Sequence, residues 1–115
     1  MDREELERGG VDYGGAMDRF MGNQALYEKF LLKFPTDATF PALREALEAD
    51  DCQAAFMQAH TLKGLTGNLS LDSLAKLAVP MVEALRGGDL AAAKALFPAL
   101  EAEYDRLCAA IQAAR

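Results

Sequence analysis

The sequence contains one histidine, two cysteines and no tryptophan among its 115 residues. Valine, isoleucine and threonine together number only eight, whereas alanine and leucine number 22 and 17. Because Ala and Leu favour helices and β-branched residues favour strands, this composition predicts an all-α protein. The length is that of one domain, so we expect a single domain over residues 1–115, with an N-terminal segment and short helix over 1–22 and a helical bundle over 23–113.

The scarcity of histidine and cysteine excludes a closed zinc site, because such a site needs four ligands and Cys52, Cys108 and His60 supply three. A metal held only by carboxylates is not excluded by this count. Two distant thiols and a charged N-terminal stretch unlike a signal peptide indicate a cytoplasmic protein with both cysteines in its core. No apolar run approaches the roughly 20 residues of a membrane span. The net charge of −6 argues against nucleic acid as a partner.

Turn-forming residues divide the chain into helices. The glycines around Val11–Tyr13 predict a loose segment, followed by a short helix over Ala16–Met21. Longer helices are expected over Gln24–Phe34, Thr39–Ala49, from Asp50 or Asp51 to about Leu69, Leu71–Leu85 and Leu90–Ala113. The short connections between them imply antiparallel neighbours, and so an up-and-down four-helix bundle with short N-terminal helical additions.

Several residues are expected to begin, end or bend these helices. Asn23 and Ser70 are predicted N-caps, and either Asp50 or Asp51 can cap the helix that follows. Arg86-Gly87-Gly88-Asp89 is typical of a turn between helices. Pro80 predicts a kink or break near Ala78. The expected buried stripes are Leu26 and Phe30 with Lys33 or Phe34; Phe40, Leu43 and Leu47; Leu71, Leu74, Leu77, Ala78 and Met81; and Leu96, Leu100, Tyr104, Leu107 and Ile111.

His60, the only histidine, is expected on an exposed helix face. With about 100° per residue, Leu62, Leu65 and Leu69 lie on the opposite side of this helix and form its core stripe. Lys63, Gly64 and Gly67 share the face of His60. An exposed imidazole is largely neutral and nucleophilic at pH 7, and Lys63 supplies a positive charge one turn away.

The two glycines on this face need an explanation, because each costs about 1 kcal/mol relative to alanine in a helix interior. In a chain this rich in alanine, Gly64 and Gly67 indicate that some group approaches the imidazole closely. Two ordinary alternatives stay open at this point. A lone surface histidine is usually only solvated, and the glycines could instead allow two helices to pack closely, although they lie away from the leucine stripe.

The stretch Ala59-His60-Thr61-Leu62-Lys63-Gly64, continued by Leu65-Thr66-Gly67-Asn68-Leu69-Ser70-Leu71, resembles the signature of histidine-containing phosphotransfer (HPt) domains, His-x-Leu-Lys-Gly on the second helix of a four-helix bundle. The resemblance extends over most of the chain. It departs from the family at Ser70, where members often carry Gly; because serine is a good N-cap, we expect the turn to survive.

The resemblance implies a role for each matching residue. His60 would accept a phosphoryl group at Nε2 from a receiver-domain aspartate and pass it to another response regulator or hybrid kinase receiver. Lys63 would stabilise the charge of that group, and Gly64, supported by Gly67, would give the partner access. The chain has no Gly-rich phosphate loop and no Lys, Asp and Asn set of the kind that kinases use to bind ATP and Mg²⁺, so we expect no ATP-dependent activity. We also expect no cofactor of its own, with Mg²⁺ supplied by the receiver.

Phe56 and Met57 flank His60 one turn earlier and are candidates for docking the partner, although Phe56 could equally pack against a neighbouring helix. We expect the protein to act as a monomer. A second hypothesis is a helical adaptor or dimerisation module that keeps the scaffold without transferring phosphate. A metal or haem bundle is disfavoured because no Glu-x-x-His pattern is present.

Overall fold

The computed structural model describes all 115 residues and contains only helices and turns. The elements are α1 (Arg3–Arg8), α2 (Tyr13–Arg19), α3 (Gln24–Lys33), the 3₁₀ turn η1 (Phe34–Thr36), α4 (Thr39–Glu48), α5 (Cys52–Asn68), α6 (Asp72–Arg86) and α7 (Leu90–Ala113). The all-α prediction is confirmed, and the bounds of the helices from α3 onward lie within a few residues of those expected. No helix is long and apolar enough to cross a membrane.

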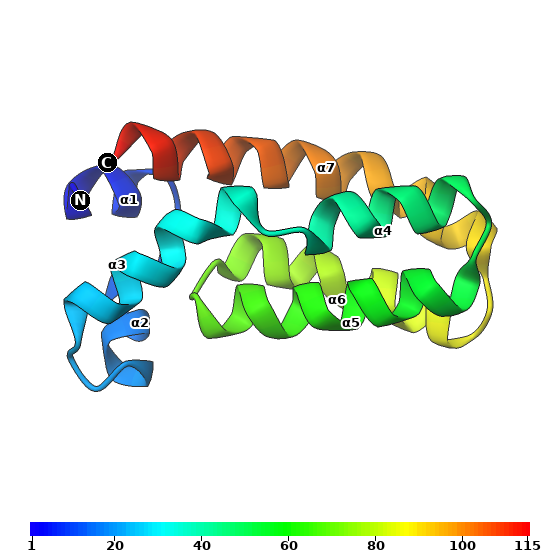
Figure 1. Ribbon diagram of the computed structural model, residues 1–115, viewed down its shortest axis with the longest axis horizontal. Coiled ribbons are helices and arrows are strands. Elements are labelled where there is room, and N and C mark those ends of the chain that lie inside the picture. The colour runs from blue at the N-terminus through cyan, green and yellow to red at the C-terminus, as the bar shows by residue number, and fades with distance from the viewer.

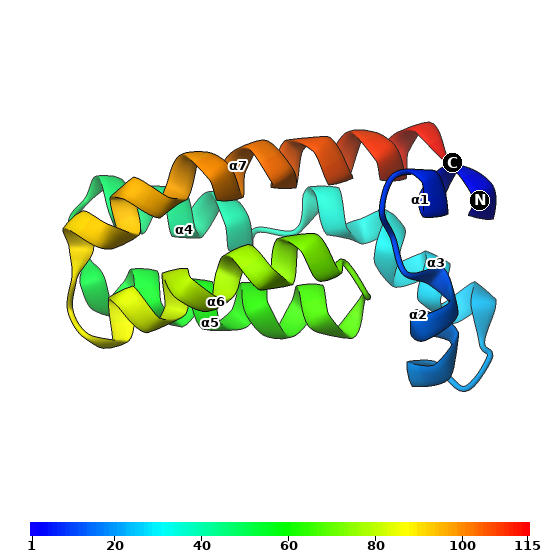
Figure 2. The ribbon, with the colours of Figure 1, turned by 180° about the vertical axis from the view of Figure 1, so that it is seen from behind.

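Helices α4 to α7 form the bundle, and successive helices run in opposite directions (Figures 1 and 2). In both views α4 and α7 make one layer and α5 and α6 the other, with α5 packed between α4 and α6. The short helices α1 and α2 lie with α3 at the end of the molecule that also holds both chain termini. This is the expected up-and-down bundle with N-terminal helical additions.

One continuous core of 27 buried residues runs through these helices. The predicted stripes of α6 and α7 are largely confirmed, since only Leu77 and Leu96 among them are partly rather than fully buried. The cysteines, expected in the core, are free and lie half-buried at its edge.

The predicted buried face of α3 was wrong at two of its three positions. Leu26 and Phe30 are 39% and 44% exposed, and Tyr27 and Leu31 are buried in their place. Phe34, offered as an alternative to Lys33, is buried as predicted. Apolar residues occur on both sides of this helix, so its sequence does not decide which side faces inward. The phenol of Tyr27 finds a buried partner, the carbonyl oxygen of Leu69 at 2.7 Å, and this lets the aromatic ring enter the core.

Most helix starts agree with prediction. Asn23, Asp51 and Asp89 each accept a hydrogen bond from the backbone N–H three residues on, at 3.0 to 3.1 Å. The choice between Asp50 and Asp51 is therefore settled in favour of Asp51. Asp50 instead occupies the preceding turn with a φ of 54°.

One prediction on α6 was wrong. Ser70 does not cap it: Leu71 holds the N-cap position, and Ser70 lies in the turn with a φ of 58°. Of the kink or break expected near Ala78, a break does not occur, because α6 runs from Asp72 to Arg86 through Pro80. The helix buries Leu74, Ala78 and Met81, and that packing offsets the backbone hydrogen bond lost at an exposed proline.

The N-terminal segment is also more ordered than predicted. Instead of a loose stretch and a helix over Ala16–Met21, it forms α1 and α2, and α2 begins at Tyr13 and includes Gly14 and Gly15. Asp12 caps α2 by accepting from the N–H of Gly15 at 3.0 Å. This cap and the burial of Tyr13 outweigh the low helix propensity of the two glycines.

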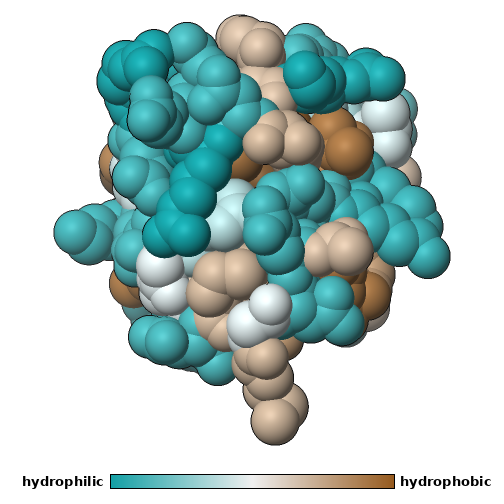
Figure 3. All heavy atoms as spheres, turned by 90° about the vertical axis from the view of Figure 1, so that its left-hand side faces the viewer, coloured by the Kyte–Doolittle hydropathy of each residue, from teal (hydrophilic) through white to brown (hydrophobic).

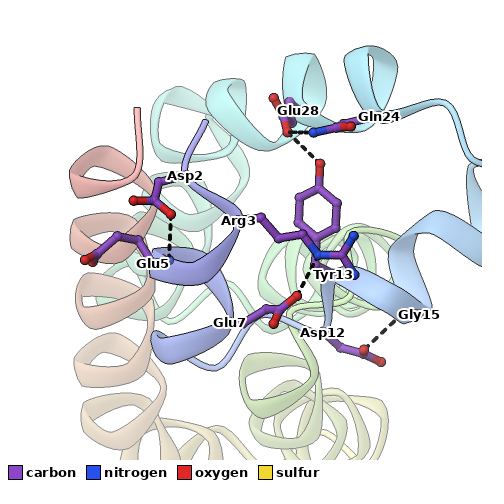
Figure 4. A network of polar contacts seen from close by, with 9 residues as sticks. All are labelled: Asp2, Arg3, Glu5, Glu7, Asp12, Tyr13, Gly15, Gln24 and Glu28. Atoms are coloured by element: carbon purple, nitrogen blue, oxygen red, sulfur yellow. Dashed lines mark hydrogen bonds and ion pairs between the residues drawn. The ribbon is translucent and has the colours of Figure 1, made fainter.

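A polar network holds these N-terminal helices to α3, as Figure 4 shows. The Tyr13 hydroxyl donates to a Glu28 carboxylate oxygen at 2.5 Å, and the Gln24 amide donates to the same oxygen at 3.1 Å. Burial and this hydrogen bond raise the pKa of Tyr13 to about 12. Burial alone would raise the pKa of Glu28, but the hydrogen bonds from Tyr13, Gln24 and the N-terminal amine outweigh it and hold this pKa below its ordinary value. The network therefore attaches the start of α2 to α3.

Candidate functional site

His60 lies on the exposed face of α5, as the sequence predicts. The opposite face of this helix is buried through Ala55, Ala59, Leu62 and Thr66. Leu65, assigned to the core stripe, is only partly buried. The core therefore holds α5 in the rotation that directs the imidazole away from the bundle.

An open depression surrounds His60, and no apolar side chain lines it. Its lining residues are Arg19, His60, Lys63, Gly64, Gly67 and Asn68. The structure thus brings together the four residues that the sequence placed on this face. It adds Asn68 from the end of the same helix and Arg19 from α2.

Two cations and no carboxylate line this depression, although the whole chain carries a net charge of −6. Neither Arg19 nor Lys63 forms an ion pair, whereas most of the other arginines do. Two uncompensated positive charges beside a nucleophilic imidazole suit an anionic group. The same arrangement does not suit Mg²⁺, which prefers carboxylate oxygens.

Gly64 and Gly67 create open space above α5. A Cβ atom at either position would have no neighbouring atom within 4 Å. No other helix approaches them, so close helix packing does not explain their presence. What they leave is room for a group from outside the molecule to approach the imidazole.

Met57 and Phe56 differ in exposure. Met57 is 61% exposed, as expected of a docking residue. Phe56 is half-buried and packs against the core, with its ring centroid 6.0 Å from that of His60 and the Arg86 guanidinium 5.2 Å from its ring. Phe56 therefore packs against the bundle core and also lies beside the imidazole of His60.

Ser70 occupies the turn directly after the site. It is fully buried, and its hydroxyl pairs with Nη1 of Arg19. Its φ of 58° lies in the left-handed region that favours glycine, which is the physical reason why a glycine suits this position. Ser70 adopts this backbone conformation, so the turn forms with serine in place of the expected glycine.

Arg19 and Asn68 were missed as site residues by sequence reasoning. Asn68 follows the motif directly and shares its helix, so extending the helical face by one turn would have found it. Arg19 is in α2, and α3 and α4 separate it in the chain from the helix of His60. Only the packing of α2 against the α5–α6 turn brings it to the site. No local pattern in the sequence signals that contact.

No group of three or more His, Cys, Asp or Glu side chains is placed to hold a metal ion.

Seen from the end that carries α1 to α3, the surface is mostly hydrophilic, with apolar side chains in separate patches (Figure 3). Large apolar side chains are nevertheless exposed in this part of the chain: Met21, Leu26, Phe30 and Leu32.

The family model of the Hpt domain matches residues 26–110, which include α5 and its exposed face. No curated protein and no solved structure gives a significant match to the chain. Hpt domains are helical phosphotransfer intermediates of phosphorelays, distinct from kinases, and they interact with receiver domains. With its four-helix bundle and a single histidine exposed on the second bundle helix, this chain belongs to the Hpt domain family.

Proposed function

We propose that the protein is a phosphorelay intermediate in which His60 accepts a phosphoryl group from a receiver-domain aspartate and passes it to a second receiver. The observation that carries this proposal is the environment of the only histidine. His60 is exposed and shares its depression with Arg19 and Lys63, two cations that form no ion pair. Gly64 and Gly67 leave open space above it.

The transfer requires an in-line displacement at phosphorus. The lone pair on Nε2 of His60 forms the new P–N bond while the bond between phosphorus and the aspartate oxygen breaks. The carboxylate leaves with that electron pair, and the passage to the next receiver runs the same step in reverse. The attacking nitrogen uses its own lone pair, so the step needs no further base.

Lys63 has the role of neutralising the transferred phosphoryl group. It lies one turn after His60 on α5 and lines the same depression without a carboxylate partner. Since the depression offers Mg²⁺ no carboxylate, we assign the metal to the acidic pocket of the receiver. A chain without a Gly-rich phosphate loop or kinase residues has no means of using ATP itself, so the phosphoryl group must come from a partner.

Docking of the receiver is supported by the surroundings of the depression. Gly64 and Gly67 leave its approach unobstructed, and exposed Met57 offers an apolar contact beside His60. On the other side, a groove lined by Phe30, Leu65 and other residues shares Asn68 with the depression. Exposed apolar side chains on both sides of the depression therefore give a receiver domain surface to bury around the polar site.

The free thiols of Cys52 and Cys108 fit a reducing compartment, so we place the protein in the cytoplasm. We propose that it acts there as a monomer. The alternative function, an adaptor or dimerisation module on the same scaffold, has no need for a cleared and cationic histidine face. His60, Lys63 and Gly64 are all present here, and this favours phosphotransfer.

The test is incubation with a phosphorylated receiver domain, comparing the wild type with His60→Gln. The wild type should acquire acid-labile, alkali-stable phosphate that is absent from the variant. Because His60 is exposed, the variant should unfold at the same temperature as the wild type. Absence of label on the wild type from a panel of receivers would favour the adaptor.

Docking is tested separately with Met57→Glu. This variant should accept phosphate more slowly from a receiver but at the wild-type rate from phosphoramidate, a small donor that needs no docking surface. Equal rates with the receiver would remove Met57 from the interface.

A further inference from the structure

We propose that Arg19 is a second phosphoryl-binding side chain of the His60 site, and that the hydroxyl of Ser70 positions it. This inference rests on the proposed function and adds to it a residue outside the motif. Residue 19 also lies outside residues 26–110, the part of the chain that matches the family model.

The position of Arg19 supports this role. It is in the last turn of α2 and lines the depression with His60, Lys63, Gly64, Gly67 and Asn68. Lys63 reaches this depression from α5 itself, whereas Arg19 reaches it from a different helix. Two cations from two elements can contact different oxygens of one phosphoryl group.

The hydrogen bonding of Arg19 leaves it free to bind an anion. Its Nη1 pairs with the Ser70 hydroxyl, which accepts, and no carboxylate forms an ion pair with it. Arg3, Arg8, Arg44, Arg86 and Arg106 all pair with glutamates. A guanidinium has five N–H donors in a planar fork that matches phosphate oxygens, so most of the donors of Arg19 remain available.

Ser70 gives an independent reason to regard this contact as specific. It is fully buried and adopts a φ of 58°, where a side chain is sterically costly and glycine is not. Its hydroxyl makes one hydrogen bond, the one with Arg19, so the residue that strains the turn is also the residue that holds the cation.

The packing of α2 keeps Arg19 in this place. The backbone N–H of Asp12 donates to the Ser70 carbonyl oxygen at 3.2 Å, so the start of α2 also contacts this turn. The Tyr13–Glu28 hydrogen bond holds the same helix to α3. The cation is therefore in place before a phosphoryl group arrives, and this reduces the entropy lost on binding it.

A purely structural role would give a different result. If Arg19 only joined α2 to the α5–α6 turn, its loss would lower stability and leave the chemistry at His60 unchanged. The experiment therefore measures the phosphotransfer rate, the ³¹P chemical shift of the phosphohistidine and the unfolding temperature together.

The variants are Arg19→Gln, Arg19→Lys and Ser70→Gly, with Arg115→Gln as the matched control. Arg115 is exposed, also lacks an ion pair, and its loss changes the net charge by the same amount. Each is labelled from a phosphorylated receiver, with His60→Gln as the blank. Arg19→Gln should slow transfer by roughly tenfold, the effect of one charge-assisted hydrogen bond, and should shift the ³¹P resonance. Arg19→Lys should recover part of the rate, and Arg115→Gln should behave as the wild type.

Ser70→Gly removes the uncertainty of misfolding, because glycine relieves the strained φ and the turn should form at least as well. It leaves Arg19 present but without its anchor, so the protein should be as stable as the wild type and still transfer more slowly. Wild-type transfer by Ser70→Gly would overturn the positioning role.

Wild-type rate and ³¹P shift in Arg19→Gln, with the wild type labelled and His60→Gln unlabelled, would refute the role of Arg19 and leave the proposed function standing. A slow Arg19→Gln with an unchanged ³¹P shift and a lowered unfolding temperature, not rescued by lysine, would also refute it. If the wild type itself takes no label from receivers or phosphoramidate, the proposed function fails, and the assignment of Arg19 fails with it.

Discussion

Replacing Gly64 and Gly67 by alanine should stabilise the protein and impair its activity at the same time. Neither new Cβ atom meets any atom within 4 Å, so the substitutions introduce no clash. Gly64 lies inside α5, where alanine is favoured over glycine by about 1 kcal/mol. Gly67 is one residue from the end of that helix, where we expect about half that gain.

The double variant should therefore gain about 1.5 kcal/mol in its free energy of unfolding. For a domain of this size, 1 kcal/mol corresponds to roughly 4 °C, so the unfolding temperature should rise by about 6 °C. Circular dichroism measures this directly. Gly14→Ala is the matched control, since it makes the same change in α2 and not on the His60 face of α5. Its Cβ would meet only the Asp12 carboxylate, at 3.9 Å. It should leave transfer unchanged.

Phosphotransfer from a receiver should fall in the double variant, because the two methyl groups occupy the space through which the partner approaches His60. Labelling by phosphoramidate should fall much less, since that donor is small. The reasoning is refuted if the variant is less stable than the wild type, because the helix would then not tolerate alanine. It is equally refuted if the variant accepts phosphate from receivers at the wild-type rate.

The remaining predictions concern stability, measured by urea unfolding. Tyr13→Phe removes a hydrogen bond to a charged acceptor and should cost about 1 to 2 kcal/mol; no loss would mean that the contact with Glu28 is not maintained in solution. The pKa of Glu28 is lowered in the folded protein, so its ionised form stabilises the fold at pH values above the ordinary carboxyl pKa. This stability is lost as the pH falls through the lowered pKa. The free energies of unfolding of the wild type and Glu28→Gln should therefore converge in acid. Asp51→Ala should cost about 1 kcal/mol through loss of the α5 cap, and an unchanged midpoint would contradict the assigned start of that helix.

The parts of the fold that the sequence predicts well depend on local chemistry. The face of α5 follows from the spacing of Leu62 and Leu69 against His60, and the caps at Asn23 and Asp89 follow from side chains that bond the backbone three residues away. Such signals are complete within one helix. The central residues of the site, which lie on one face of α5, were therefore predictable.

What the sequence could not predict depends on contacts between helices. The inward face of α3 depends on contacts such as the hydrogen bond from Tyr27 to Leu69, two residues that are far apart in the chain. The helicity of Gly14 and Gly15 depends on the packing of α2 and on its cap at Asp12. Arg19 reaches the His60 depression for the same reason, and unlike Asn68, which follows the motif on the same helix, it has no signal in the local sequence.

The turn between α5 and α6 receives the N-terminal part of the chain at three points. Asp12 and Arg19 contact Ser70, and Tyr27 contacts Leu69. With seven residues, α2 is shorter than the roughly 12 to 15 residues that an isolated helix needs, so we expect it to become ordered only on a turn that has already formed. The two cations of the site then have different folding histories. Lys63 is in place once the bundle forms, whereas Arg19 arrives with the last elements to dock and leaves with the first to open, so hydrogen exchange in α2 reports how often the site is complete.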